Sequence, residues 1–195
     1  HGANRLGGNG VANSTVFGGI AGDTMAQWVP RHGALEAPCP AALEAALDLA
    51  HAPFAKPAGS LSPIRDALHA LMWQKAGILR DAAGLDAAAR GLDELDSALD
   101  ETGTSTSKAF NLAWQEWLNL KSLILTSRAI VTAAAARQES RGAHWREDFP
   151  QTKPDADGLA VTLTSLDASG RIALGWQPVA FSRLRPGQSL LNTAA

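Results

Sequence analysis

The sequence contains a single cysteine and no apolar run long enough to cross a membrane. Cys39 has no second cysteine to pair with, so an internal disulfide is excluded and a reducing compartment fits. The apolar runs all fall short of the ~18 residues that a membrane-spanning helix needs. The glycine-rich start also lacks the basic stretch and apolar segment of a signal peptide. We therefore expect a cytoplasmic protein.

Charge of either sign is scarce as well. The 195 residues include 17 Lys and Arg against 19 Asp and Glu, and charged residues make up 18% of the chain. The resulting net charge of −2 gives no electrostatic attraction to nucleic acid or to an anionic membrane. Hydrophobic residues make up 46%, which is ordinary for a globular protein and argues against disorder.

Several common catalytic patterns are missing too. The 5 histidines are scattered, and the sequence has no HExxH pair and no cluster of cysteine and histidine. It contains neither a GxSxG nucleophile turn nor a P-loop. We therefore expect no metal site. Because the GxSxG and P-loop motifs are absent, the sequence gives no support to a serine hydrolase or a P-loop nucleotidase.

The prolines divide the chain into segments. Six of the 10 prolines lie between Pro30 and Pro63, and none lies between Ile64 and Phe149. Because proline interrupts helices, the first zone is expected to be a punctuated connector and the second to hold long helices. The expected segments are 1–30, 31–61, 62–140 and 141–195.

Three apolar runs at helical spacing fill the segment 62–140 and predict a mainly α fold built on an antiparallel three-helix bundle. The first helix is expected to begin with Ser62 as its N-cap and Pro63 in its first turn. Turns near Gly84 and Gly103 would separate the helices, and the third would extend over 107–140. The recurring apolar residues are Ile64, Leu68, Leu71, Met72 and Leu79, then Leu85, Leu92, Leu95 and Leu99, then Phe110, Trp114, Trp117, Leu118, Leu123, Ile124 and Ile130.

Shorter elements flank the bundle. A helix is expected over 16–28, ended by Pro30. Its glycines at 18, 19 and 22 lower helix stability, so we expect something to pack close to the backbone there. A short helix is expected over 41–50. After the bundle, apolar and polar residues alternate over 159–174 around a turn at 167–170, which predicts a small β-hairpin.

In the opening stretch HGANRLGGNG, one arginine lies among glycines and other small residues that leave the backbone accessible. One interpretation is a surface turn before a helix. The other is an anion-binding helix start, in which Asn9 caps the helix and the free amides of Gly10 and Val11 face a ligand. Arg5 would then offer a planar fork suited to a carboxylate. The residues alone leave both interpretations open.

The stretch ESRGAHWREDFP, residues 139–150, gathers three acids, two arginines and one histidine at the end of the longest predicted helix. It could be a solvated helix end, where the dipole favours Arg and His. It could instead be a docking loop whose ion pairs lock this domain against another, and a metal site is the weakest interpretation. The roles of Arg141, His144 and Arg146 stay open.

Together, the two stretches resemble one family. HGANRLGGNG, followed by Val16-Phe17-Gly18, resembles the substrate-and-flavin loop of the succinate dehydrogenase/fumarate reductase flavoprotein subunits, where HGANRLGGNS is the usual form. ESRGAHWREDFP resembles the ESRGAH-x-R-x-DFP loop that follows the helical domain of the same family. The motifs occur in the family's order, and the L-aspartate oxidases share both loops in variant form.

The resemblance implies a role for each of the opening residues. Arg5 matches the arginine that binds a substrate carboxylate. Asn9, Gly10 and Val11 fall in the cofactor-binding stretch, with Gly10 standing where the family usually has serine. In the intact protein, FAD would exchange hydride with a dicarboxylate, and residues 1–30 would be the flavin-contacting loop and helix at the tail of the FAD-binding domain.

The resemblance also implies that the chain is a C-terminal fragment. Its partners would be the N-terminal FAD-binding and capping domains and an iron–sulfur subunit, in a complex attached peripherally to the inner face of a membrane. The isolated fragment is expected to be inactive and not to retain FAD. The alternatives are an L-aspartate oxidase-like flavoprotein and a purely structural or interaction domain.

Overall fold

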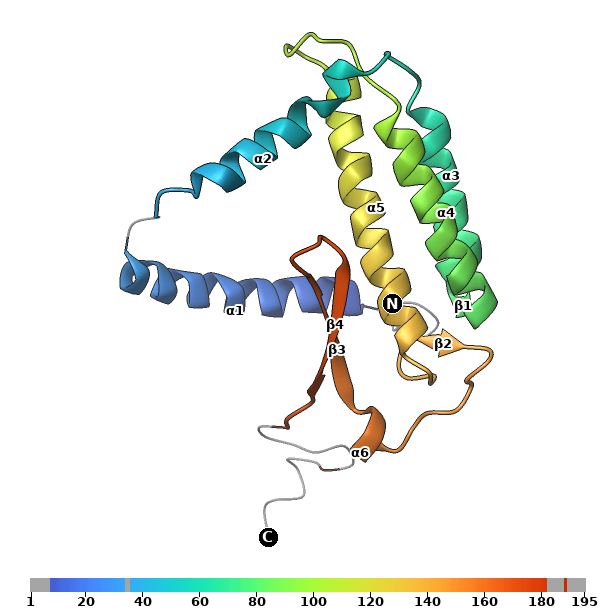
Figure 1. Ribbon diagram of the computed structural model, residues 1–195. Coiled ribbons are helices and arrows are strands. Elements are labelled where there is room, and N and C mark those ends of the chain that lie inside the picture. The colour runs from blue at the N-terminus through green and yellow to red at the C-terminus, as the bar shows by residue number, and fades with distance from the viewer. Residues whose placement is uncertain (1–7, 34–35, 182–187, 189–195) are drawn as a thin grey trace.

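Three antiparallel helices form a bundle at one side of the molecule (Figure 1). The computed structural model describes residues 8–33, 36–181 and 188. Within these ranges α3 (Ser62–Ala76), α4 (Ala82–Asp100) and α5 (Leu112–Ala136) lie side by side and alternate in direction. The mainly helical fold with an antiparallel bundle in the segment 62–140 is therefore confirmed.

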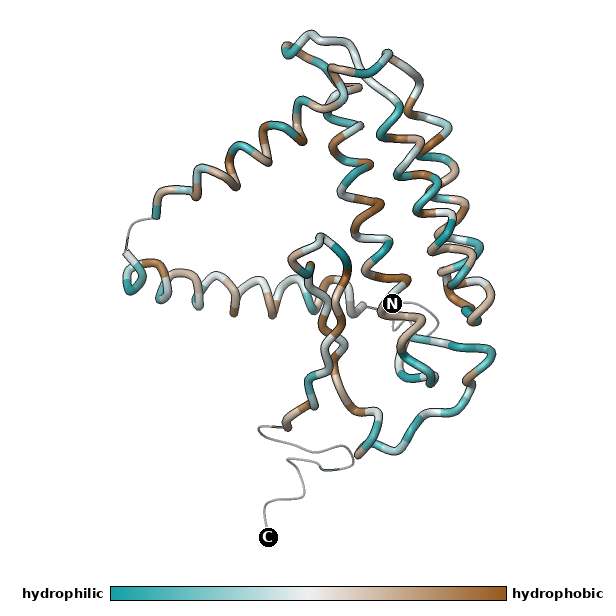
Figure 2. Tube along the Cα trace, in the orientation of Figure 1, coloured by the Kyte–Doolittle hydropathy of each residue, from teal (hydrophilic) through white to brown (hydrophobic). Residues whose placement is uncertain are grey.

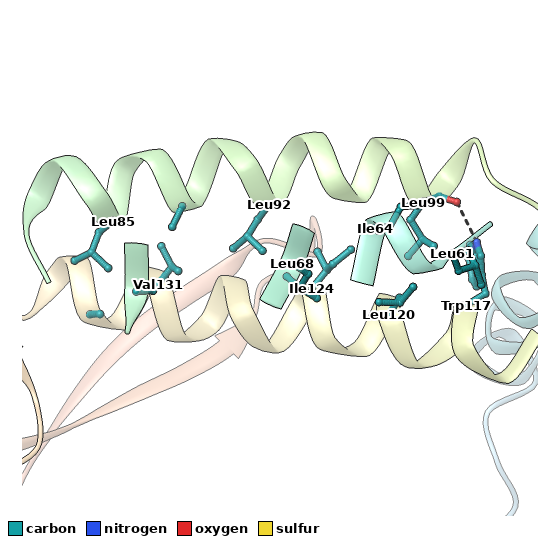
Figure 3. Packing of buried hydrophobic residues seen from close by; sticks show 13 residues of the cluster. Leu61, Ile64, Leu68, Leu85, Leu92, Leu99, Trp117, Leu120, Ile124 and Val131 are labelled. Atoms are coloured by element: carbon teal, nitrogen blue, oxygen red, sulfur yellow. Dashed lines mark hydrogen bonds between the residues drawn. The ribbon is translucent and has the colours of Figure 1, made fainter. Parts of the chain in front are cut away.

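The bundle encloses an aliphatic core with Trp117 at one end (Figure 3). The Trp117 indole N–H donates to the carbonyl oxygens of Leu99 and Thr102, each at 3.0 Å. These acceptors allow a large aromatic side chain with one polar atom to be buried. The buried hydrophobic residues are Leu61, Ile64, Leu68, Ala76, Leu85, Ala88, Leu92, Leu99, Trp117, Leu120, Ile124, Val131 and Ala134.

Ion pairs fasten α4 to α5 beside this core. Lys121 Nζ lies 2.6 Å from a carboxylate oxygen of Asp96 and 2.7 Å from one of Asp100. Two turns further along α5, Arg128 pairs with Asp96 and with Asp93. Partly buried cations on one helix thus meet acids spaced three or four residues apart on the other, and this fixes the register of the two helices.

The first two helices of the bundle begin differently from the prediction. Ser62 is the first residue of α3, and its N-cap is Leu61, without a side-chain cap. Gly84 lies in the first turn of α4, because the Asp81 side chain caps that helix by accepting from the Gly84 amide at 2.6 Å. The chain turns earlier, at 77–81, so Leu79 belongs to the short strand β1 (Leu79–Arg80) rather than to α3.

The third helix is shorter at both ends than the predicted range 107–140. Phe110 has a φ of 53°, which no helix accommodates, and Asn111 then caps α5 by accepting from the Trp114 amide at 3.0 Å. At the other end Arg137 is the C-cap, with extended backbone. The turn near Gly103 is confirmed, because α4 ends at Asp100 and α5 begins at Leu112. A Cβ at Gly103 would collide with backbone carbonyl groups of Pro53 and Lys56.

Two small pairs of strands complete the fold. The predicted hairpin is confirmed as β3 (Ala160–Leu166) paired antiparallel with β4 (Ile172–Pro178). In its turn, Asp167 accepts from the amides of Ser169 and Arg171. A short helix, α6 (Asp155–Gly158), precedes the hairpin. The other pair was not predicted: β1 lies parallel to β2 (Trp145–Arg146) and joins the α3–α4 turn to the loop after α5.

The helices α1 (Asn9–His32) and α2 (Pro40–His51) lie outside the bundle as two arms (Figures 1 and 2). The short 3₁₀ helix η1 (Ala52–Ala55) links α2 to the bundle. Pro30 does not end α1, because it lies in the last turn and the chain leaves the helix only at Gly33, with a φ of 70°. No helix within the described ranges combines the length and apolar character that a membrane crossing requires.

Candidate functional site

The described part of the opening stretch forms the start of α1. Gly8 is its N-cap, with a left-handed φ of 74° and no side-chain cap, and Asn9 is already helical. The prediction that Asn9 caps the helix is therefore wrong. The Ala12 amide donates to the Gly8 carbonyl oxygen at 3.2 Å, which begins the helical ladder. Gly10 and Val11 lie in the first turn, as predicted, and Arg5 lies outside the described residues.

This helix start is open to a ligand. An added Cβ at Gly8 or Gly10 would meet nothing within 4 Å, and Val11 is 77% exposed. The first turn carries no acidic residue. The amides of a first helical turn have no carbonyl one turn earlier within the helix, and the helix dipole adds partial positive charge there. The geometry suits a planar or anionic group that approaches the backbone, such as one edge of a flavin.

The second stretch, 139–150, is held by charges that are buried inside the chain. The Glu139 side chain is 2% exposed and accepts from Arg137 at 2.6 Å, from Arg141 at 3.1 Å and from the Lys153 amide at 3.1 Å. Burial raises the pKa of Glu139, but these donors outweigh it and hold the pKa below its ordinary value. Arg141 extends the chain of charges to Asp155, 2.9 Å away.

Arg137 connects this network to the hairpin. One of its terminal nitrogens donates to the Ala160 carbonyl oxygen at 2.6 Å and the other to the Gly158 carbonyl oxygen at 3.2 Å. Its guanidinium group also lies over the Trp176 ring, 4.8 Å from the centroid. The residue that caps α5 therefore positions the start of β3 and a side chain of β4.

Arg146 is the most deeply buried charge of the stretch, with 1% of the residue exposed. It donates to the carbonyl oxygens of Ala134, Ala135 and Arg137 at 2.9–3.3 Å, which closes the C-terminal end of α5. It also makes two 2.7 Å hydrogen bonds to Asp148.

Asp148 joins Arg146 to the start of α4. Besides Arg146, it accepts from the amide of Ala82 at 2.9 Å, at the start of α4. The Arg146 hydrogen bonds, followed by that of Ala82, lower the pKa of Asp148 to about 2. Asp148 therefore remains ionised far below neutral pH and ties the loop after α5 to α4.

His144 lies between two arginines. Its Nδ1 is 2.9 Å from Arg80 Nη1, and its Nε2 is 3.2 Å from the carbonyl oxygen of Arg137. Burial lowers the pKa of His144, and the charges of Arg80, Arg146 and Arg137 lower it further; together they outweigh the hydrogen bond to the Arg137 carbonyl oxygen, which raises it. The side chain therefore acts as a neutral hydrogen-bonding link at neutral pH.

The contacts of residues 139–150 bear on the three interpretations of this stretch. A solvated helix end is wrong, because Glu139, Ser140 and Arg146 are buried. The ion pairs and hydrogen bonds that the structure describes for this loop join it to α4, α6 and the end of α5, so they fasten segments of this chain together. Docking of the loop on another domain stays a prediction. In the part of the chain that is described, no three potential metal-binding side chains gather.

Sequence reasoning missed the partners of this loop. Arg80 and Arg137 were not singled out, and β1 and β2 have two residues each, too few for any periodic pattern. The partners Arg80 and His144 are 64 residues apart, and Arg137 and Ala160 are 23 apart. The sequence signal was the clustering of acids and arginines in 139–150. It did not show which groups accept hydrogen bonds from these arginines.

The family model and the related proteins that match this chain all point to one family. The family described as "Fumarate reductase flavoprotein C-term" matches residues 65–190. The 8-methylmenaquinol:fumarate reductase flavoprotein subunit of Wolinella succinogenes is 32% identical over 189 residues, which cover 95% of this chain and 31% of that protein. The fumarate reductase flavoprotein subunit of Mycobacterium tuberculosis H37Rv is 33% identical over 196 residues, covering 96% and 33%.

Solved structures of fumarate reductases also resemble this chain. A chain of Escherichia coli quinol fumarate reductase superposes with a TM-score of 0.79 at 28% identity, over 95% of this chain and 32% of that one. A structure titled quinol-fumarate reductase with menaquinol molecules gives 0.78 at 30% identity, over 94% and 33%. Adenylylsulfate reductase from Archaeoglobus fulgidus shares the fold, with a TM-score of 0.67 at 18% identity.

The present chain spans about a third of the length of these relatives. The family match extends from the second turn of α3 to beyond β4, so it includes the bundle, the buried charges and the hairpin. The relatives cover nearly the whole chain, including α1. The resemblance inferred from the two motifs is therefore confirmed, and the chain belongs to the fumarate reductase flavoprotein C-terminal family.

Proposed function

We propose that the chain acts as the C-terminal third of an FAD-dependent oxidoreductase that transfers hydride between a dicarboxylate and the flavin. Family membership supports the flavoprotein class, and the names of the relatives support fumarate or succinate as the substrate. The observation that carries the proposal is the open, glycine-flanked start of α1, which follows the arginine of the opening stretch. The rest of the flavoprotein would supply most of the FAD contacts.

In this function the start of α1 is one wall of the flavin site. The amides of Asn9, Gly10 and Val11 would hold the polar edge of the isoalloxazine ring, where a serine in place of Gly10 would add a hydroxyl. Bound FAD supplies the two-electron chemistry. The positive end of α1 would stabilise negative charge on a bound flavin, because a helix dipole is fixed in place before charge develops.

Arg5 would hold the substrate. Its planar guanidinium group can donate two parallel hydrogen bonds to one carboxylate, which fixes both the position and the rotation of a dicarboxylate. Such orientation is a large part of the rate acceleration in a two-substrate reaction. The sequence places Arg5 four residues before Asn9, so substrate and flavin would meet the same loop.

The remaining elements would serve as scaffold and contact surface. From Gly10 to Gly33, every residue of α1 and its C-cap is exposed, apolar side chains included. The FAD-binding and capping domains of the complete flavoprotein would cover this helix, and residues 1–30 would be the tail of the former. The bundle and hairpin would contact an iron–sulfur subunit, which would place the complex at the inner face of a membrane.

The test is Arg5→Lys in the complete flavoprotein. Lysine keeps the charge but loses the second, parallel hydrogen bond, so kcat/KM for succinate or fumarate should fall by at least roughly tenfold. The melting temperature should change little. Arg90→Lys, at an exposed position of α4 where lysine can keep the pair with Asp86, is the matched control and should leave both quantities unchanged.

Two outcomes would contradict the assignment. Full activity of Arg5→Lys toward every dicarboxylate tested, L-aspartate included, would show that Arg5 does not hold the substrate. Loss of folding in Arg5→Lys would show a structural role instead. In both cases the opening stretch would be a turn that enters α1.

A further inference from the structure

His144 joins the C-terminal ends of two helices of the bundle. On one side it contacts Arg80, which also donates to the carbonyl oxygens of Ala76 and Gly77 at 3.1 and 2.8 Å, at the end of α3. On the other side it contacts the carbonyl oxygen of Arg137, the C-cap of α5. The imidazole ring is therefore the middle member of a link that runs from α3 to α5.

The two partners define the protonation state of the ring. A guanidinium group has only donors and a carbonyl oxygen only accepts. Nδ1 must therefore carry the lone pair that faces Arg80, and Nε2 must carry the hydrogen that faces Arg137. Only the neutral Nε2–H tautomer satisfies both contacts. A second proton on Nδ1 would set a donor against a donor, 2.9 Å apart.

The charged groups around His144 oppose that second proton. Arg80 faces it from β1, Arg137 from the end of α5 and Arg146 from β2. The carboxylates of Glu139 and Asp148 are engaged by Arg137 and Arg146, respectively. An imidazolium ion at this place would have three guanidinium groups as neighbours, in a half-buried site where their repulsion is only partly screened.

We propose that His144 is an acid-released latch, which holds the α3–α4 turn against the loop after α5 when neutral and lets go of Arg80 when protonated. The backbone pairing of β1 with β2 and the hydrogen bond from the Glu147 amide to the Arg80 carbonyl oxygen lie beside the latch. Release would therefore loosen these two segments first. The Arg146–Asp148 contact to α4 does not involve His144 and would remain.

The direction of the pH effect follows from the lowered pKa of His144 in the folded chain. An unfolded histidine titrates near ~6.5. Above that pH the side chain is neutral in both states, and the latch contributes its full stabilisation. As the pH falls through the ordinary value toward the folded pKa, the unfolded state takes up the proton first, so the stabilisation is lost.

Hydrogen exchange of the 195-residue chain at pH 7 and pH 5 tests the latch. After correction for intrinsic rates, exchange of the amides in 77–81 and 143–147 should be faster at pH 5 by at least about threefold. His144→Gln, which cannot titrate, should abolish that difference. The matched control is His69→Gln on exposed α3 surface, which should retain it.

Equal acceleration in wild type and His144→Gln, or none in wild type, would overturn the proposal. Should His144→Gln fail to fold, nitrogen NMR of the wild-type histidines decides. The proposal requires the Nε2–H tautomer at pH 7 and a protonation midpoint for His144 below the ~6.5 of an ordinary histidine. The Nδ1–H tautomer, or a midpoint at or above that value, would contradict it.

Discussion

Arg146 shows how one buried charge can organise several segments. Its guanidinium group is satisfied by three carbonyl oxygens at the end of α5 and by the carboxylate of Asp148. A buried ion pair need not stabilise a fold more than a well-packed apolar pair would. Removal of one partner, however, leaves the other buried acceptors without donors, and this asymmetry makes the residue testable.

Arg146→Met should lower the free energy of unfolding by about 3–5 kcal/mol, because the α5 carbonyl oxygens and Asp148 lose their donors. Urea denaturation followed by circular dichroism measures it. Arg65→Met is the control, since Arg65 is 41% exposed and its ion pairs with Asp66 and Glu116 lie at the surface. That change should cost less than about 1 kcal/mol. Similar losses in the two variants would contradict the role given to Arg146.

Asp148 should make the chain sensitive to acid. Its pKa in the folded state is about 2, below the ordinary 3.8, so the unfolded chain binds the proton first. The stabilisation is therefore present above the ordinary pKa and is lost as the pH falls from about 4 toward 2. Denaturation curves recorded across that range should show a shallower decline for Asp148→Asn than for wild type. Asp66→Asn, at an exposed site, should decline like wild type.

At the scale of elements, glycine has opposite surroundings in α1 and in α4. A Cβ at Gly91 in α4 would come within 2.8 Å of the Leu71 side chain, so this glycine allows α3 and α4 to approach. A Cβ at Gly18, Gly19 or Gly22 in α1 would meet nothing within 4 Å. The close packing that the α1 glycines predict is thus not supplied by the described part of this chain.

The double substitution Gly18→Ala, Gly19→Ala should therefore stabilise α1 in the isolated chain. Alanine favours a helix interior over glycine by about 1 kcal/mol per residue. Slower hydrogen exchange across α1 would measure the gain, and Gly91→Ala in α4 should show a smaller gain or a loss because Leu71 must move. In the complete flavoprotein the same double substitution should weaken FAD retention. Unchanged exchange in the isolated chain would contradict the open surroundings of α1.

At the scale of the whole molecule, the chain divides into a packed body and two exposed arms (Figure 1). The bundle, the loop 139–150 and the hairpin are joined by the core and the buried charges. In contrast, α1 is exposed throughout its described side chains, and in α2 only Ala50 is partly covered. Helices without packed faces open easily, because propensity alone gives marginal stability.

Limited digestion with trypsin should therefore cut first after Arg31, at the exposed end of α1. Cleavage at Arg90, Lys121 or Arg128 in the bundle should follow only after global unfolding. Mass spectrometry of the early fragments measures the order, and the trimmed product should melt at nearly the temperature of the intact chain. Early cuts within α4 or α5 would show that the bundle is not the stable body.

Much of the fold was predictable because its signals are local. Helical spacing of leucines and the absence of proline between Ile64 and Phe149 identified the bundle, and strict alternation identified the hairpin. The ends of the helices were less predictable. Asp81 and Asn111 moved two helix starts through side-chain caps, while a left-handed Phe110 kept α5 from starting earlier.

Local sequence signals were enough to predict the helices, the hairpin and the family, because apolar periodicity and two long motifs occur in consecutive residues. The directions of the arginines between 137 and 146 depend on tertiary packing, since several of their acceptors lie in other elements. The pairing of β1 with β2 and the contact of Arg80 with His144 bring together residues 64 or more positions apart. Such contacts depend on how whole helices pack, and no local pattern encodes them.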